Sequence, residues 1–124
     1  MNSAIQRDLN ITQGCTEKLR CRYLNRTTKL PVDLTGYIAR LQLFHSSNLN
    51  AAPALSLASG GSGITIDTLN GVIEVTFSNA QTLALRVGMS VYQYNLKVQA
   101  PGSNEITALL WGAVSVKPVL TTFS

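Results

Sequence analysis

Apolar and polar residues alternate strictly along several stretches of this chain, and this alternation limits the fold more than any other feature. In residues 92–99, Tyr92, Tyr94, Leu96 and Val98 alternate with polar residues. Because successive side chains of an extended chain point to opposite faces, a period of two predicts a β-strand with one buried face and one solvated face. The chain therefore builds sheets whose inner faces are apolar.

The same pattern recurs along the whole chain. The expected strands are residues 9–12, 15–23, 39–43, 54–57, 64–67, 73–77, 92–99 and 106–116. Clusters of Gly, Asn, Ser and Pro separate them, as turns require. The sharpest is Asn70-Gly71, which predicts a two-residue type I′ turn and a hairpin that pairs 64–67 with 72–77. The one helical candidate is residues 79–85, a single turn with Ser78 as its cap.

Strands of this number and length predict one all-β domain over residues 1–124. Seven to nine short strands at roughly ten-residue spacing fit an antiparallel sandwich of two sheets, which share a core about 10 Å thick. A small closed barrel is the main alternative.

The last strand, residues 106–116, has an outward face that is only partly polar. Its even-numbered residues, including Ile106, Leu110 and Val114, form the expected inward set. Leu109 and Trp111 then point outward. Either this strand is covered on both faces, or Leu109 and Trp111 contact a partner, because tryptophan is a favoured anchor at interfaces.

Basic residues gather in one short stretch. Lys18, Arg20 and Arg22 share one face of the strand at 15–23, about 6.6 Å apart, and Arg26 follows in the next turn. Such a row suits the carboxylates of a neighbouring subunit, or a solvated edge that discourages stray pairing. Binding of single-stranded nucleic acid would require aromatic residues on the same face, but Tyr23 points the other way. We therefore expect protein partners and no specific nucleic acid.

The sequence offers few groups for catalysis or ligand binding. Only 13% of its residues are charged, and it has one histidine and two cysteines. His45 lies beside Ser46, but neighbours on a strand point to opposite faces and no acidic residue is close enough to orient the histidine. Cys15 and Cys21 lie about 20 Å apart on one strand, too far for a disulfide, and their spacing does not suit zinc.

Glycines 60, 61 and 63 precede a strand, whereas a phosphate cradle requires a helix at that place. The sequence also lacks the roughly 18 consecutive apolar residues of a membrane span. We predict that the protein is not an enzyme and has no cofactor, metal, small-molecule ligand or membrane partner.

Several motifs, taken in order, resemble one protein family. They are Asp8-Leu9-Asn10-Ile11-Thr12, Asp33-Leu34-Thr35-Gly36, Gly63-Ile64-Thr65-Ile66, Asn70-Gly71-Val72-Ile73, Ala80-Gln81-Thr82 and Gly112-Ala113-Val114-Ser115-Val116. This order is similar to the N-terminal domain of the baseplate upper proteins of tailed phages, which are small virion structural proteins. The chain departs from the family near its end, where Pro118-Val119-Leu120-Thr121 replaces a Pro-Glu-Val-Thr-like sequence.

The resemblance implies an immunoglobulin-like sandwich with a structural, non-enzymatic role in the virion, assembled in the cytoplasm of the bacterial host. Its partners would be other virion proteins and copies of itself, contacted in part through terminal arms at 1–6 and 119–124. The function expected is a multicopy subunit that links tail, baseplate or fibre components. A capsid decoration protein is the first alternative, and a carbohydrate- or receptor-binding module that uses Trp111 is the second.

Overall fold

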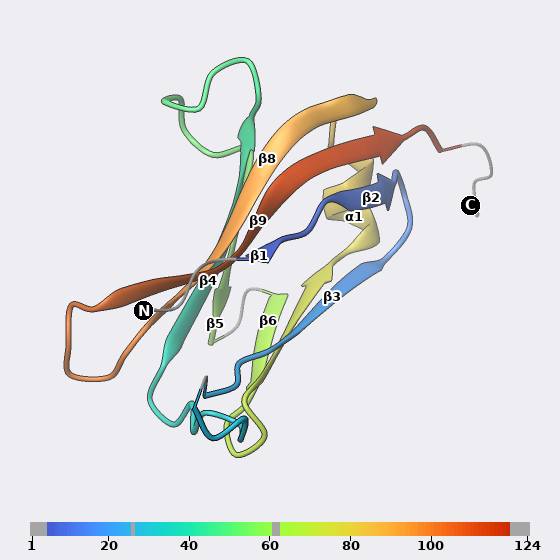
Figure 1. Cartoon of the computed structure of the whole chain (residues 1–124). Coiled ribbons are helices and arrows are strands. Elements are labelled where there is room, and N and C mark those ends of the chain that lie inside the picture. Colours follow the sequence, from blue (N-terminus) through green and yellow to red (C-terminus); the bar gives the residue numbers. More distant parts are fainter. Residues whose placement is uncertain (1–4, 26, 61–62, 120–124) are drawn as a thin grey trace.

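The computed structural model describes residues 5–25, 27–60 and 63–119 (Figure 1). Its elements, in chain order, are β1 (Ile5–Gln6), β2 (Leu9–Thr12), β3 (Glu17–Arg22), β4 (Ile38–His45), β5 (Leu55–Ser59), β6 (Gly63–Asp67), β7 (Val72–Phe77), α1 (Asn79–Leu83), β8 (Gly88–Gln99) and β9 (Ile106–Lys117). The prediction of an all-β chain with a single helical turn is confirmed.

The strands form one continuous sheet that curls back over itself. Its order is β1-β9-β8-β4-β5-β6-β7-β3, and β2 also pairs with β9. Figure 1 shows β9, β8 and β4 facing β6, β7 and β3, which gives the two layers of a sandwich-like fold. Three pairings, β1 with β9, β2 with β9 and β5 with β6, are parallel, so the sheet is mixed. Alternation reveals the face of a residue but carries no information on the direction of the neighbouring strand.

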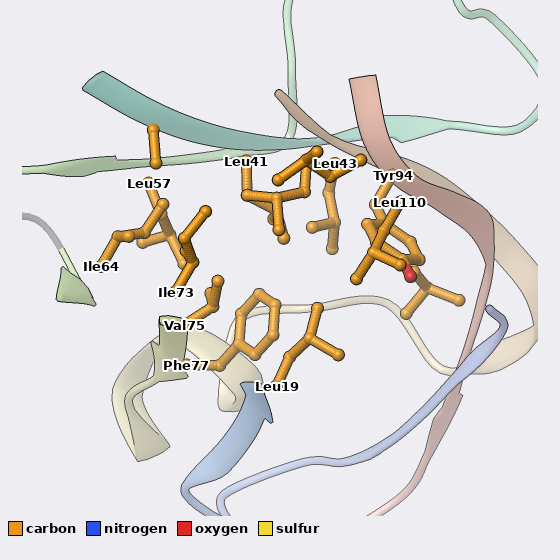
Figure 2. Packing of buried hydrophobic residues seen from close by; sticks show 14 of the residues in the cluster. Leu19, Leu41, Leu43, Leu57, Ile64, Ile73, Val75, Phe77, Tyr94 and Leu110 are labelled. Atoms are coloured by element: carbon orange, nitrogen blue, oxygen red, sulfur yellow. The ribbon is translucent and has the colours of Figure 1, made fainter. Parts of the chain in front are cut away.

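The core lies between the two layers (Figure 2). Leu41, Leu43 and Tyr94 point inward from one layer and meet Val75 and Phe77 from the other. Side chains from the apolar positions of 92–99 are at most 3% exposed, as the alternation predicts.

The hairpin between β6 and β7 forms as predicted, but its turn does not. Ile64 pairs with Val75 and Asp67 with Val72, which leaves a four-residue loop, 68–71, in place of the two-residue turn. Of Asn70 and Gly71, only the glycine has a positive φ, of +64°. A Cβ on Gly71 would lie 2.7 Å from the carbonyl oxygen of Tyr23. The close approach of the backbone at Tyr23 therefore requires a glycine at position 71. Local turn rules do not take such a distant contact into account.

Helix α1 begins at a complete capping box. The Ser78 hydroxyl accepts from the Gln81 N–H, and the Gln81 side chain accepts from the Ser78 N–H. The fully buried Thr82 donates its hydroxyl to the Cys15 carbonyl, 2.8 Å away. This bond anchors α1 to the turn between β2 and β3. The helix ends at Leu83, two residues before the expected end.

The Asp33–Gly36 box forms a tight turn before β4. The Asp33 carboxylate accepts from the Thr35 hydroxyl at 2.6 Å and from the Thr35 N–H at 3.0 Å. These hydrogen bonds lower the pKa of Asp33, the hydroxyl more than the N–H. Leu34 is 1% exposed, and Gly36 takes a φ of +81°. The motif at residues 33–36 therefore has a structural role: it closes the turn before β4 and buries Leu34.

A β-bulge in β9 reverses the expected orientation of its first residues. Leu96 pairs with Leu110 but Lys97 pairs with Ala108, so Leu109 is the extra residue. The bulge shifts the phase of the alternation, and Ile106 is 60% exposed while Leu109 is 8% exposed. The predictions that Ile106 faces inward and Leu109 outward are therefore wrong.

The link between β1 and β2 packs closely on β9. The Tyr94 hydroxyl donates to the Arg7 carbonyl at 2.6 Å, and the Asp8 carboxylate accepts from the Ala113 N–H at 3.0 Å. Residues 5–6 of the expected N-terminal arm belong to β1, and Val119 N–H donates to the Gln13 side chain. The other residues of both arms, 1–4 and 120–124, lie outside the described residues.

The Tyr94 hydroxyl makes the fold sensitive to high pH. Burial, opposed by the nearby Arg7, raises its pKa to about 12 from an ordinary 10.0. Because the folded state prefers the neutral phenol, this stabilisation is complete below pH 10.0 and is lost as the pH rises through about 12. We expect the free energy of unfolding to fall more steeply in this window for the wild type than for Tyr94→Phe, measured by urea denaturation. Equal slopes would contradict the assignment.

Candidate interaction surface

The described residues contain no group of three His, Cys, Asp or Glu side chains that could hold a metal ion. The His45 ring packs against Tyr92 in a tilted arrangement with ring centroids 5.1 Å apart, and the Ser46 hydroxyl donates to the Ser90 carbonyl. Cys15 and Cys21 are free thiols, and burial raises the pKa of Cys21. Within the described ranges, no helix is both long and apolar enough to cross a bilayer.

The predicted basic row lies on β3, which ends the strand order of the sheet. Lys18, Arg20 and Arg22 are exposed, while Leu19 between them is 2% exposed. The row is partly neutralised, because Lys18 Nζ lies 3.8 Å from a carboxylate oxygen of Glu74 and Arg20 is directly opposite the same residue. Arg26, the fourth basic candidate, lies outside the described residues.

The two apolar candidates on β9 have different environments. Trp111 is 46% exposed on the outer face, level with Gln6 of β1 and Asn95 of β8. Leu109 is buried by the bulge and is not available to a partner. The expected pair is therefore reduced to a single exposed aromatic residue.

A groove of about 310 Å³ crosses the outer face of β4, β8 and β9. It is lined by Ile38, Arg40, Gln42, Phe44, Asn95, Lys97, Val98, Gln99 and Ile106. The pairing registers place these residues in rows across the strands: Ile38, Gln99 and Ile106 form one row, and Arg40 and Lys97 are in the next. The sequence analysis did not predict this groove, although it predicted that Asn95, Lys97 and Gln99, which line it, face outward.

The charges in this groove are unusual for a solvated sheet face. Arg40 and Lys97 are directly opposite each other and both are exposed. Among the described residues, the one ion pair is Lys18 with Glu74, so neither groove cation has a carboxylate partner. Like charges at directly opposed positions destabilise a sheet.

We expect Arg40→Gln to raise the free energy of unfolding by about 0.2 to 1 kcal/mol, because it removes this repulsion. Lys18→Gln is the matched control: it also removes one positive charge but loses an attraction, so it should lower stability by about 0.2 to 1 kcal/mol. Urea denaturation at low and high salt measures both effects, which shrink as salt screens the charges. Destabilisation by Arg40→Gln would contradict the expected repulsion.

A second hollow of about 560 Å³ lies between α1 and the ends of β4 and β5. Its lining is mainly Ala and Leu, with His45, Gln81, Arg86 and Tyr92. Two of the polar side chains at its wall are engaged within the chain: the Tyr92 hydroxyl accepts from the Arg86 N–H at 2.8 Å, and the Gln81 side chain completes the capping box.

Comparison with known proteins gives a structural likeness without a sequence match. No model of a protein family matches the chain, and no curated protein matches its sequence. The solved structure of the N-terminal domain of phage TP901-1 ORF48 is similar, with a TM-score of 0.52 and 10% sequence identity. The likeness covers 88% of this chain and 83% of that chain. At this identity it shows a shared fold, and to that extent the resemblance to phage proteins is confirmed.

Proposed function

We propose that this protein is a non-enzymatic structural subunit of a tailed-phage virion, which joins tail, baseplate or fibre components through protein contacts. The observation that carries the proposal is the fold, shared over 88% of the chain with a domain of a phage protein. Two surface features support it: an exposed Trp111 on β9 and a groove whose cations have no described partner.

The mechanism of such a subunit is geometric. A rigid curled sheet holds strand edges and outer faces at fixed positions, and burial of patches of standard interface size holds neighbouring subunits in place. β3 presents an exposed basic face at one end of the strand order. β8 and β9 are the longest strands. Partners are other virion proteins and further copies of this chain.

The experiment is to locate the protein in purified particles. Mass spectrometry of gradient-purified virions should find it in several copies per particle, and immunogold labelling should place it at the tail tip. Absence from particles that contain their other structural proteins would overturn the proposal. Labelling spread over the capsid would replace it with the decoration alternative.

A receptor- or carbohydrate-binding role is the second candidate, favoured by the exposed ring of Trp111. Tyr92 and Tyr94 are at most 3% exposed and so cannot serve as stacking platforms. Glycan-array binding that is lost in Trp111→Ala would favour this role.

A further inference from the structure

The groove on the outer face of β4, β8 and β9 combines exposed aliphatic side chains with two cations that pair with no carboxylate among the described residues. Arg40 and Lys97 are one row away from Ile38 and Ile106, which are 52% and 60% exposed. Phe44 lines the same groove further along β4. A single exposed isoleucine requires no explanation, but two in register beside two cations in one concavity form a patterned surface.

The exposure of Ile106 is a consequence of the bulge in β9. If β9 paired regularly through Leu109 with no bulge, strict alternation would turn Ile106 inward and Thr107 outward. The bulge reverses this and places a large aliphatic side chain on the outer face. Bulges commonly serve to redirect a side chain toward a functional surface.

The charge arrangement favours an anionic occupant. Two cations held opposite each other repel, and a carboxylate placed between them would convert the repulsion into two attractive contacts. The chain carries a formal net charge of +4, so a second copy would meet an unfavourable long-range field. An acidic segment of a different protein fits the groove better.

We propose that this groove binds an extended segment of a partner protein in which a Glu or Asp lies two residues from an aliphatic residue. Along β4, Arg40 follows Ile38 by two residues, a separation of about 6.6 Å. An extended segment that runs along β4 repeats this spacing, so its carboxylate reaches Arg40 and Lys97 while its aliphatic side chain covers Ile38 and Ile106. The identity of the partner as a virion component rests on the proposed function.

The first test uses a fluorescein-labelled peptide, Thr-Val-Thr-Glu-Thr-Val-Thr, and its Gln analogue, with the full-length protein. We expect the Glu peptide to bind at least tenfold more tightly than the Gln peptide, and Arg40→Gln/Lys97→Gln to weaken its binding at least tenfold. The matched control is Lys29→Gln/Arg86→Gln, which removes the same net charge from exposed positions outside the groove and the β3 row and should change binding less than twofold. Circular dichroism confirms that both variants are folded.

Four results would overturn the inference. The first three are no binding of the Glu peptide, equal affinity for the Glu and Gln peptides, and an equal loss of peptide affinity in the two double variants. The fourth is that the face with Arg40 and Lys97 binds a single-stranded oligothymidylate more tightly than it binds the Glu peptide. The fourth result would mean that Arg40 and Lys97 bind the phosphates of a nucleic acid.

A second test separates this inference from the proposed function. Tagged wild type, Arg40→Gln/Lys97→Gln and the Lys29→Gln/Arg86→Gln control are supplied during phage production, and their incorporation into purified particles is compared. At least a fivefold loss for the groove variant alone supports the inference. Incorporation of the wild type and the groove variant to equal extents overturns the groove assignment and leaves the proposed function intact. Failure of the wild type to enter particles overturns the proposed function, and the peptide test still decides the groove.

Discussion

Gly112→Ala should release the β1–β2 segment from the sheet and lower the free energy of unfolding by about 2 to 4 kcal/mol. An added Cβ on Gly112 would overlap the Arg7 carbonyl and lie 2.9 Å from the Asp8 carboxylate. These are backbone and tightly bonded atoms, because Arg7 accepts from Tyr94 and Asp8 accepts from Ala113. The segment must therefore move away, which uncovers Ile11, now 1% exposed.

Hydrogen exchange distinguishes this local release from a general loss of stability. The N–H groups of Arg7 and Gln13, which donate to Trp111 and Lys117, should lose protection, while amides of β6 and β7 should retain theirs. Gly102→Ala is the control, since an added Cβ there meets nothing within 4 Å, although φ is +66°. It should cost about 1 kcal/mol from backbone strain and leave exchange in β1 and β2 unchanged. Unchanged protection in Gly112→Ala would contradict the close packing of β9 on the N-terminal strands.

Phe77→Ala should lower the free energy of unfolding by about 3 to 5 kcal/mol. Phe77 is 1% exposed and lies in the core beside Leu19 and Val75 (Figure 2). It is the largest of the fully buried side chains, and its removal leaves a cavity between the layers that the surrounding strands cannot close.

Guanidinium denaturation measures this loss, with Phe44→Ala as the matched control. Phe44 is only partly buried, on the outer face of β4, so the same truncation should cost less than half as much. Similar losses for the two variants would mean that the core is not centred where β7 faces β4 and β8.

The arrangement of buried and exposed faces was largely predictable from the sequence. The alternation of residues 92–99 identified the dry face of β8, and Ser78 and Gln81 identified the start of α1, because both signals are local. The features that were missed depend on distant parts of the chain. The conformation of the turn at Asn70-Gly71 depends on the close contact of Gly71 with Tyr23, which local turn rules do not include. The alternation of apolar residues also does not indicate that β1 and β2 pair with β9 in parallel.

The candidate surface was harder to predict than the fold. The row of Lys18, Arg20 and Arg22 is exposed as its spacing indicated. The groove was missed because it depends on register: Arg40 and Lys97 are far apart in sequence, and only the pairing of β4 with β8 brings them together. The bulge at Leu109 cannot be read from residue types, since Leu109 and Leu110 are both apolar.

The pairing of β9 with the first two strands sets the timing of folding. The hydrogen bond between Ala113 and Asp8 spans 105 residues. At about 5 to 20 residues translated per second, the nascent β2 waits roughly 5 to 20 s on the ribosome before its partner emerges. Contacts this distant along the chain also make folding slow. A chain that stops short of β9 cannot close its sheet, so only molecules synthesised through β9 present the finished outer face.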